Sequence, residues 1–254
     1  MIPELQLYRY AFYVLVAATV GFLVWVSRMP TGKRRYYLPV PIICGTLALG
    51  YFGMSAELLT ATAANGQPMP MSRYVDYFIT TPVMIAIAGL VAGASRRQQV
   101  AMFVFGLGWI GATVVGYFLE PPLDSVSTLV TLASLVVLIY LMVGPVTKRS
   151  GKQGGERVLL YGKLRNLLIL IWVFYLVLGI ASRQNLGLLD AFSGVFLGVY
   201  IDVLTRVGFG VLVLRATDAT DQVIEQLQSS GSGDDGSGGV TLEKSDDPAV
   251  DPAD

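Results

Sequence analysis

The chain alternates long apolar stretches with short polar segments, and this pattern predicts seven membrane-spanning helices. A helix that crosses the hydrocarbon core of a bilayer needs about 20 predominantly apolar residues. Seven stretches meet this requirement, although the third, sixth and seventh contain interior polar residues. They run near Tyr8–Val26, Tyr37–Leu59, Arg73–Val91, Val100–Phe118, Val126–Val146, Leu164–Ala181 and Leu189–Leu214. The expected fold is an all-α membrane protein, a bundle of seven transmembrane helices within residues 1–215.

Lys and Arg are concentrated in alternate loops between these stretches, and this asymmetry predicts the orientation of the bundle. The first, third and fifth loops together carry twelve of them. The second and fourth loops carry none, and the sixth carries only Arg183. Basic residues accumulate in cytoplasmic loops. We therefore expect the N-terminus outside, the C-terminus inside, and a multi-pass location in the plasma membrane.

The composition agrees with a membrane protein and limits the chemistry. Of the 254 residues, 54% are hydrophobic and 14% are charged, whereas soluble domains carry roughly 25% charged residues. The chain has no histidine, which excludes a histidine-based metal or acid–base site. Its single cysteine, Cys44, excludes an internal disulfide and is interpreted as a packing residue. Since no nucleophile–base pair or metal-ligand cluster is recognisable, we expect no enzyme activity.

The net charge of zero conceals an acidic C-terminal segment at residues 216–254. This segment has ten acidic residues and a single basic one, Lys244, among many Gly and Ser. Such a composition cannot bury enough apolar surface to fold, so we expect a disordered cytoplasmic tail. Its negative charge would repel phosphate, which argues against nucleic-acid binding.

Charged side chains within the third and seventh stretches are the strongest candidates for a functional site. An ionisable residue inside the membrane is costly and marks a functional site by default. Arg73, Asp76 and Thr80 share one helix face, and so do Asp202 and Arg206, because their spacing is three or four residues. If the two helices face each other, two cations and two anions form a neutral cluster, since buried charges need partners.

Simpler interpretations of these residues stay open at this point. Arg73 can lie at the outer end of its helix and extend its charged group towards water. Asp202 and Arg206 can form an ion pair within one helix, whose role is only to fix the rotation of that helix. Trp25 and Trp109 are most simply packing or lipid contacts, whereas Trp172 lies in the middle of a stretch and is less easily explained in this way.

Several motifs in these stretches resemble the microbial (type I) rhodopsin family, in particular its haloarchaeal bacteriorhodopsin-like members. The segment Arg73–Pro82 is similar to the third-helix signature of the family. Trp172-x-x-Tyr175 resembles its sixth helix, and Asp202–Gly210 resembles its seventh. Tyr51 resembles a tyrosine of the second helix close to the charged residues. The resemblance extends over all seven stretches.

The resemblance implies a fold in which a lysine of the seventh helix holds retinal as a protonated Schiff base. It implies that Asp76 and Asp202 are the counterion carboxylates, that Arg73 lies on their outer side, and that Tyr51 and Tyr175 are hydrogen-bonding partners. By the same resemblance, Tyr77, Trp172 and Tyr175 line the retinal pocket. Besides the lipid bilayer, the implied partners are further copies of the chain in a trimer, or other proteins of rhodopsin and carotenoid pathways.

The departures from the family pattern concern the cofactor. Arg206 stands at the position of the retinal-binding lysine, and all five lysines of the chain belong to the predicted cytoplasmic side. The other departures are Ile87 at the position of the proton donor of pumps, Gln184 and Gly194 near the outer proton-releasing pair, Leu176 and Gly179 in place of a sixth-helix proline and tryptophan, and a fifth helix without tryptophan.

These departures favour an opsin-like protein without a covalent cofactor. Arginine stays protonated, so we expect neither a Schiff base nor light-driven ion transport. Arg206 is expected to replace the Schiff-base nitrogen between Asp76 and Asp202. A regulatory or partner-binding role fits this hypothesis, as does a retinoid or carotenoid held without a covalent bond, for which Gly179 and Thr128 are expected to leave a larger cavity. The alternatives are a retinal photoreceptor or light-driven pump or channel, as in the family generally, and a passive ion channel.

Overall fold

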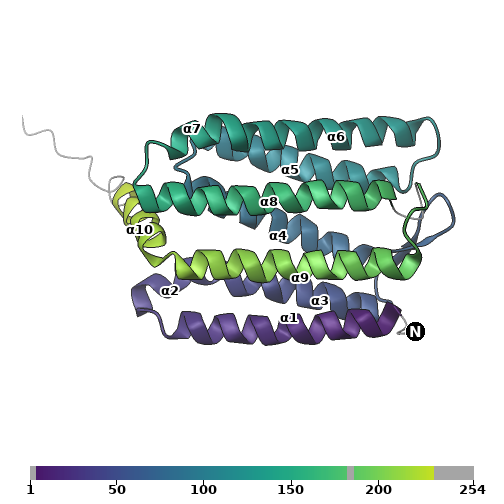
Figure 1. Ribbon diagram of the computed structural model, residues 1–254, viewed down its shortest axis with the longest axis horizontal. Helices are drawn as coiled ribbons and strands as arrows, with labels where there is room; N and C mark the ends of the chain where they lie inside the picture. The colour runs from purple at the N-terminus through teal and green to yellow at the C-terminus, as the bar shows by residue number, and fades with distance from the viewer. Residues whose placement is uncertain (1–3, 182–185, 232–254) are drawn as a thin grey trace, which may run out of the picture.

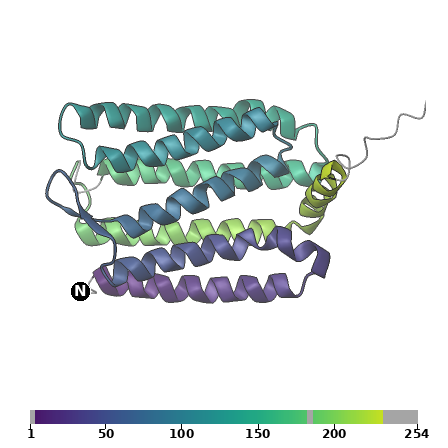
Figure 2. The ribbon, with the colours of Figure 1, turned by 180° about the vertical axis from the view of Figure 1, so that it is seen from behind.

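The computed structural model describes residues 4–181 and 186–231 and shows long helices lying side by side (Figures 1 and 2). The N-terminus lies at one end of this bundle, and the short helices α2, α7 and α10 lie at the other. The helical segments are α1 Glu4–Ser27, α2 Thr31–Tyr37, α3 Pro39–Ser55, α4 Met71–Val91, α5 Arg96–Gly116, α6 Leu123–Leu141, the π-helix η1 Met142–Val146, α7 Thr147–Ser150, α8 Gly155–Ala181, α9 Ala191–Arg215 and α10 Thr217–Gly231.

The seven predicted spans are confirmed. Six helical segments are long and apolar enough to cross a membrane, and α2 with α3 makes the seventh as a span that is bent by 41°. The break falls at Leu38, immediately before Pro39, whose ring nitrogen has no hydrogen to donate to the helix. The protein is therefore an all-α bundle with the two described ends of the chain on opposite sides. Which side faces the cytoplasm stays a prediction.

The ends of the helices differ from the sequence prediction where charged residues continue a helix beyond the apolar stretch. Helix α8 begins at Gly155, well before the expected Leu164. Arg157 lies in this added segment and is buried, with its Nε 3.0 Å from the carbonyl oxygen of Val91 and its Nη2 2.8 Å from that of Leu90. The Leu90 carbonyl also accepts from the backbone N–H of Gly93, so Arg157 adds to the bonds at the end of α4 and ties the start of α8 to it.

The second loop forms a small hairpin that hydropathy did not predict. Strands β1 (Thr60–Thr62) and β2 (Pro68–Pro70) pair in an antiparallel manner, with Ala61 opposite Met69. The turn between them contains Gly66 at a φ of 77°, a conformation that glycine adopts without strain. The hairpin therefore gives order to the loop that leads into α4.

The predicted disordered tail begins with a helix, which corrects the expected boundary at residue 216. Helix α10 covers the end of the bundle, and Ala219, Val223 and Ile224 on its inner face are buried in the main hydrophobic core. These apolar residues recur at helical spacing, a signal that the acidic composition of the whole segment concealed. Residues 232–254 lie outside the described part of the chain.

The third and seventh spans meet across the interior of the bundle. Helices α4 and α9 each pack against both α3 and α8, so their inner faces point at each other. On the other side of α9, Gly210 allows a close approach, because a Cβ at this position would lie 2.7 Å from the ring of Phe22 and 2.8 Å from Val40. Close packing of α9 on α1 and α3 thus places its charged face towards α4.

Candidate functional site

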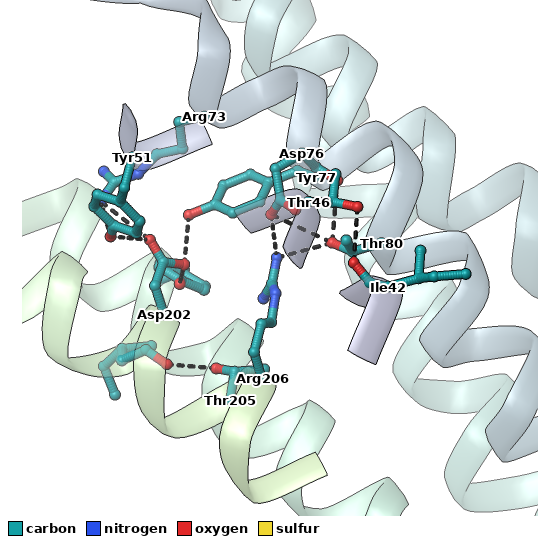
Figure 3. A network of polar contacts seen from close by, with 12 residues as sticks. Ile42, Thr46, Tyr51, Arg73, Asp76, Tyr77, Thr80, Asp202, Thr205 and Arg206 are labelled. Carbon is teal, nitrogen blue, oxygen red and sulfur yellow. Dashed lines mark hydrogen bonds and ion pairs between the residues drawn. The ribbon is translucent and has the colours of Figure 1, made fainter. Parts of the chain in front are cut away.

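A cluster of buried charges joins α4 to α9. Arg73, Asp76 and Thr80 of α4 lie at successive levels along one face of the helix, and Asp202 and Arg206 do the same on α9 (Figure 3). The spacing of three or four residues produces this arrangement, because such residues are neighbours on a helix surface. The structure therefore brings together all the charged residues that the sequence singled out.

The deeper of two ion pairs joins Arg206 to Asp76. The Nη2 atom of Arg206 lies 2.7 Å from Oδ2 of Asp76, and the two side chains are 3% and 0% exposed. The same nitrogen donates to the hydroxyl oxygen of Thr80 at 2.9 Å. The Thr80 hydroxyl in turn donates to the backbone carbonyl of Asp76 at 3.0 Å. Thr80 therefore acts as a second acceptor for the guanidinium, a role that the sequence did not reveal.

The outer ion pair joins Arg73 to Asp202 and is surrounded by tyrosines. The Nη2 atom of Arg73 lies 3.1 Å from Oδ2 of Asp202, which also accepts a hydrogen bond from the Tyr51 hydroxyl at 2.6 Å. The other carboxylate oxygen, Oδ1, accepts from the Tyr77 hydroxyl at 3.0 Å and from the Tyr175 hydroxyl. Each carboxylate oxygen of Asp202 therefore accepts a hydrogen bond from at least one tyrosine, in addition to the ion pair with Arg73.

Both ion pairs run between helices, and this corrects two expectations. Asp202 and Arg206 share a helix but do not pair with each other, so the intrahelical alternative is wrong. Arg206 also does not bridge the two carboxylates, because Asp202 is occupied by Arg73 and the tyrosines. Arg73 points into the bundle, and Gly198 of α9 leaves room for it, since a Cβ there would lie 3.1 Å from its Nη2.

The two pairs differ in how completely their polar atoms are satisfied. Among the described residues, Oδ1 of Asp76 and Nε of Arg206 are buried without a hydrogen-bond partner. In the outer pair only Nε of Arg73 lacks one. A buried polar atom without a partner costs about 1–3 kcal/mol. Asp76 therefore depends on Arg206 far more than Asp202 depends on Arg73.

Of the aromatic residues expected to line a pocket, Tyr77 and Tyr175 contact the charged cluster and Trp172 packs in the hydrophobic core. The guanidinium of Arg206 lies over the ring of Tyr77, 5.4 Å from its centre. The Tyr77 ring in turn contacts Tyr175, with ring centres 5.9 Å apart. Trp172 is 3% exposed, and its ring meets that of Trp109 edge-to-face at 5.7 Å. Trp109, expected to be a packing or lipid contact, therefore packs against Trp172 and the main hydrophobic core.

The remaining predicted positions lie away from this cluster or outside the described residues. Ile87 packs against the main apolar core of the bundle. Gly194 lies near the beginning of α9, and Gln184 is outside the described part of the chain. Over residues 4–181 and 186–231, no group of three or more Cys, Asp or Glu side chains is placed to hold a metal ion. The arrangement is an electrically balanced network that links two helices.

Comparison with known proteins places this chain in a family. The family model described as bacteriorhodopsin-like protein matches residues 5–220. Sensory rhodopsin-2 of Natronomonas pharaonis is 30% identical over 208 residues, which cover 80% of this chain and 84% of that protein. Bacteriorhodopsin-II of Haloarcula marismortui is 27% identical over 217 residues, which cover 80% of this chain and 86% of the relative.

Solved structures share the fold at lower identity. Thermophilic rhodopsin from Rubrobacter xylanophilus superposes with a TM-score of 0.79 at 21% identity, over 87% of this chain and 98% of that one. The light-driven proton pump from Coccomyxa subellipsoidea gives a TM-score of 0.76, also at 21% identity, over 83% of this chain and 95% of that one. The chain is a multi-pass plasma-membrane protein that belongs to the bacteriorhodopsin-like family of microbial rhodopsins.

Proposed function

We propose that this protein is an opsin that forms no Schiff base with retinal and transports no ions in response to light. One observation carries the proposal. The side chain at the position that the family resemblance assigns to the retinal-binding lysine is Arg206, and its guanidinium is paired with Asp76 at 2.7 Å. Arg206 keeps the positive charge that the protonated Schiff base carries in the family. It lacks the amine that would form a Schiff base.

The residues around Arg206 do not fit a covalently bound retinal. A Schiff base needs a lysine amine, and the lysines of the described chain are remote from Asp76 and Asp202. Lys33 pairs with Asp221 at the end of the bundle that carries α10, Lys148 and Lys152 lie in the segment between η1 and α8, and Lys163 is exposed.

The space beside the cluster also favours a protein without a covalently bound chromophore. The guanidinium of Arg206 occupies one face of the Tyr77 ring, and Trp172 is closed against Trp109. Gly179 and Thr128, expected to enlarge an inner cavity, are both exposed on the outside of the bundle. The space next to them therefore opens to the surroundings and does not enlarge the interior.

The chemistry of the guanidinium supports the absence of light-driven proton transport. A proton cycle through Asp76 needs a neighbouring group that releases a proton to this carboxylate and later regains it. Arginine stays protonated in proteins, and Arg206 is additionally held by Asp76 and Thr80. The cluster therefore holds α4 and α9 together instead of passing a proton between them.

A regulatory or partner-binding role in the membrane follows for such an opsin. It would act through its helix surfaces, either towards further copies of the chain or towards other proteins of rhodopsin and carotenoid pathways, and without enzyme activity. Binding of a retinoid or carotenoid without a covalent bond belongs to the same proposal. The names of the relatives, a sensory rhodopsin and a light-driven proton pump, favour the alternative of a working photoreceptor or pump.

Reconstitution with all-trans retinal tests the proposal. The purified full chain is mixed with retinal, its visible spectrum is recorded, and borohydride is added to trap any Schiff base. We expect no red-shifted band that resists bleaching by hydroxylamine, and no retinal attached after reduction. A trapped adduct on the unmodified chain would contradict the proposal and support a photoreceptor. A visible band that is not trapped would identify a ligand held without a covalent bond.

The variant Arg206→Lys supplies the matching positive control. It restores an amine at the same position of α9 and keeps the positive charge opposite Asp76. A pigment in this variant, together with none in the unmodified chain, assigns the loss of the chromophore to this single side chain. A variant that folds but forms no pigment assigns the loss to the residues expected to line the pocket, Tyr77, Trp172 and Tyr175, as well.

A further inference from the structure

A hollow of about 480 Å³ lies beside α1 at the end of the bundle that carries α2 and α10. Gly21, Val24 and Trp25 of α1 form its apolar part, and Arg28 and Thr217 contribute polar groups. Helix α1 ends at Ser27, so the hollow extends from the last turns of a membrane span to the polar segment that follows. The charge bias of the loops predicts that this is the cytoplasmic surface of the membrane.

The polar groups of the hollow suit an anion. Within the described residues, the Arg28 guanidinium has neither an ion-pair nor a hydrogen-bond partner, in contrast to Lys33, which pairs with Asp221. Thr217 begins α10, whose first backbone N–H groups have no partner within the helix and carry a partial positive charge. Asp218, the next residue, is exposed and forms no ion pair with Arg28.

The apolar groups of the hollow suit a hydrocarbon chain. Val24 and Trp25 are 45% and 39% exposed along the membrane-facing side of α1. A Cβ added at Gly21 would meet nothing within 4 Å, so the absence of a side chain leaves open space one turn from Trp25. Tryptophan is favoured at the level of lipid headgroups, because its ring is apolar and its N–H is polar.

We propose that this hollow binds an anionic phospholipid of the cytoplasmic leaflet, with the phosphodiester at Arg28 and the start of α10, and an acyl chain along Gly21 and Val24. Arginine and a helix N-terminus both recognise phosphate. A free phosphate would use the polar half alone, whereas a lipid uses both halves. The site involves neither the buried charge cluster nor retinal, so it does not rest on the proposed function.

Quenching of tryptophan fluorescence by brominated lipids tests the site in the purified full chain. Mixed micelles contain either brominated phosphatidylglycerol or brominated phosphatidylcholine at matched concentrations. We expect quenching at lower concentrations of phosphatidylglycerol, and we expect Trp25→Phe to remove that component. Equal quenching by the two lipids would overturn the proposal, because it would indicate contact with bulk lipid only. Complete competition by inorganic phosphate would also overturn it, in favour of a free-anion site.

Two variants test the two halves of the site separately. Arg28→Gln should weaken binding of phosphatidylglycerol about tenfold, the effect of losing one charged hydrogen bond. Arg97→Gln, an exposed arginine at the same end of the bundle, is the matched control and should leave binding unchanged. Gly21→Leu should fill the apolar half and lower lipid binding without a change in folding. Equal effects of Arg28→Gln and Arg97→Gln would show nonspecific attraction by surface charge and contradict the site.

Discussion

The two ion pairs between α4 and α9 contain the same two residue types, yet their surroundings differ. Asp202 accepts hydrogen bonds from three tyrosines in addition to Arg73, whose side chain is 21% exposed. Asp76 has Arg206 and the Thr80 hydroxyl nearby, both side chains of the pair are almost fully buried, and one carboxylate oxygen has no partner among the described residues.

This difference shows that a buried ion pair is only as robust as the hydrogen bonds around it. Removing one partner of a buried pair leaves an uncompensated charge, whereas replacing the whole pair with apolar groups is often neutral or stabilising. At Asp202 the phenol hydroxyls can continue to stabilise the carboxylate if Arg73 is lost. At Asp76 the described residues provide no comparable set of donors, so the deeper pair should be the more sensitive one.

Arg206→Ala is expected to have the largest effect on stability. It leaves the Asp76 carboxylate buried without its cation, at a cost of about 3–5 kcal/mol in the free energy of unfolding. A lower melting temperature in detergent at neutral pH measures the loss. The double variant Asp76→Leu with Arg206→Met removes both charges and should recover most of the stability. Equal losses in the single and double variants would show that packing, and not charge, is responsible.

Thr80→Val is expected to have an intermediate effect. The variant keeps the shape of the side chain but removes the second acceptor of Arg206, and an unsatisfied buried donor costs about 1–3 kcal/mol. Thermal unfolding in detergent measures the change. Thr81→Val is the matched control, because Thr81 is also buried but makes no hydrogen bond to the cluster. A larger loss from the control would refute the role assigned to Thr80.

Tyr77→Phe is expected to have a smaller effect, which sharpens the contrast between the two pairs. Oδ1 of Asp202 keeps its hydrogen bond from Tyr175, so the loss should be that of one ordinary hydrogen bond, about 0.5–1.5 kcal/mol. Tyr140→Phe, at an exposed hydroxyl on α6, should change nothing. If Tyr77→Phe destabilised the protein as much as Arg206→Ala, Asp202 would not be protected by redundancy.

Lys33→Gln provides the exposed reference and should have the smallest effect. The pair of Lys33 with Asp221 ties α2 to α10 at 2.6 Å, with the side chains 40% and 29% exposed. Exposed pairs contribute about 0.2–1 kcal/mol and weaken as salt is added. The melting temperatures of the variant and the unmodified chain should converge at high salt. A difference that persists in high salt would indicate a stronger contribution of α10 docking.

The pairing across the bundle follows in part from the order of the residues. The third and seventh spans run in the same direction, because spans alternate in direction along the chain. Helix α4 carries Arg73 before Asp76, and α9 carries Asp202 before Arg206, so opposite charges meet at each of two levels. The sequence led us to expect a neutral cluster of these four residues, and the structure pairs them across the two helices. It did not reveal which arginine reaches which carboxylate, because this depends on the relative height of the two helices.

The sequence by itself determined the seven spans, the charged faces of two of them, and the absence of a lysine inside the membrane. These properties depend on local composition and helical periodicity. Only the tertiary structure decided that Arg206 pairs with Asp76 alone, that Trp109 closes against Trp172, and that α10 covers the end of the bundle. Each of these features depends on the distance between elements that are remote in sequence. Helix packing sets these distances, and the periodicity of the sequence does not encode them.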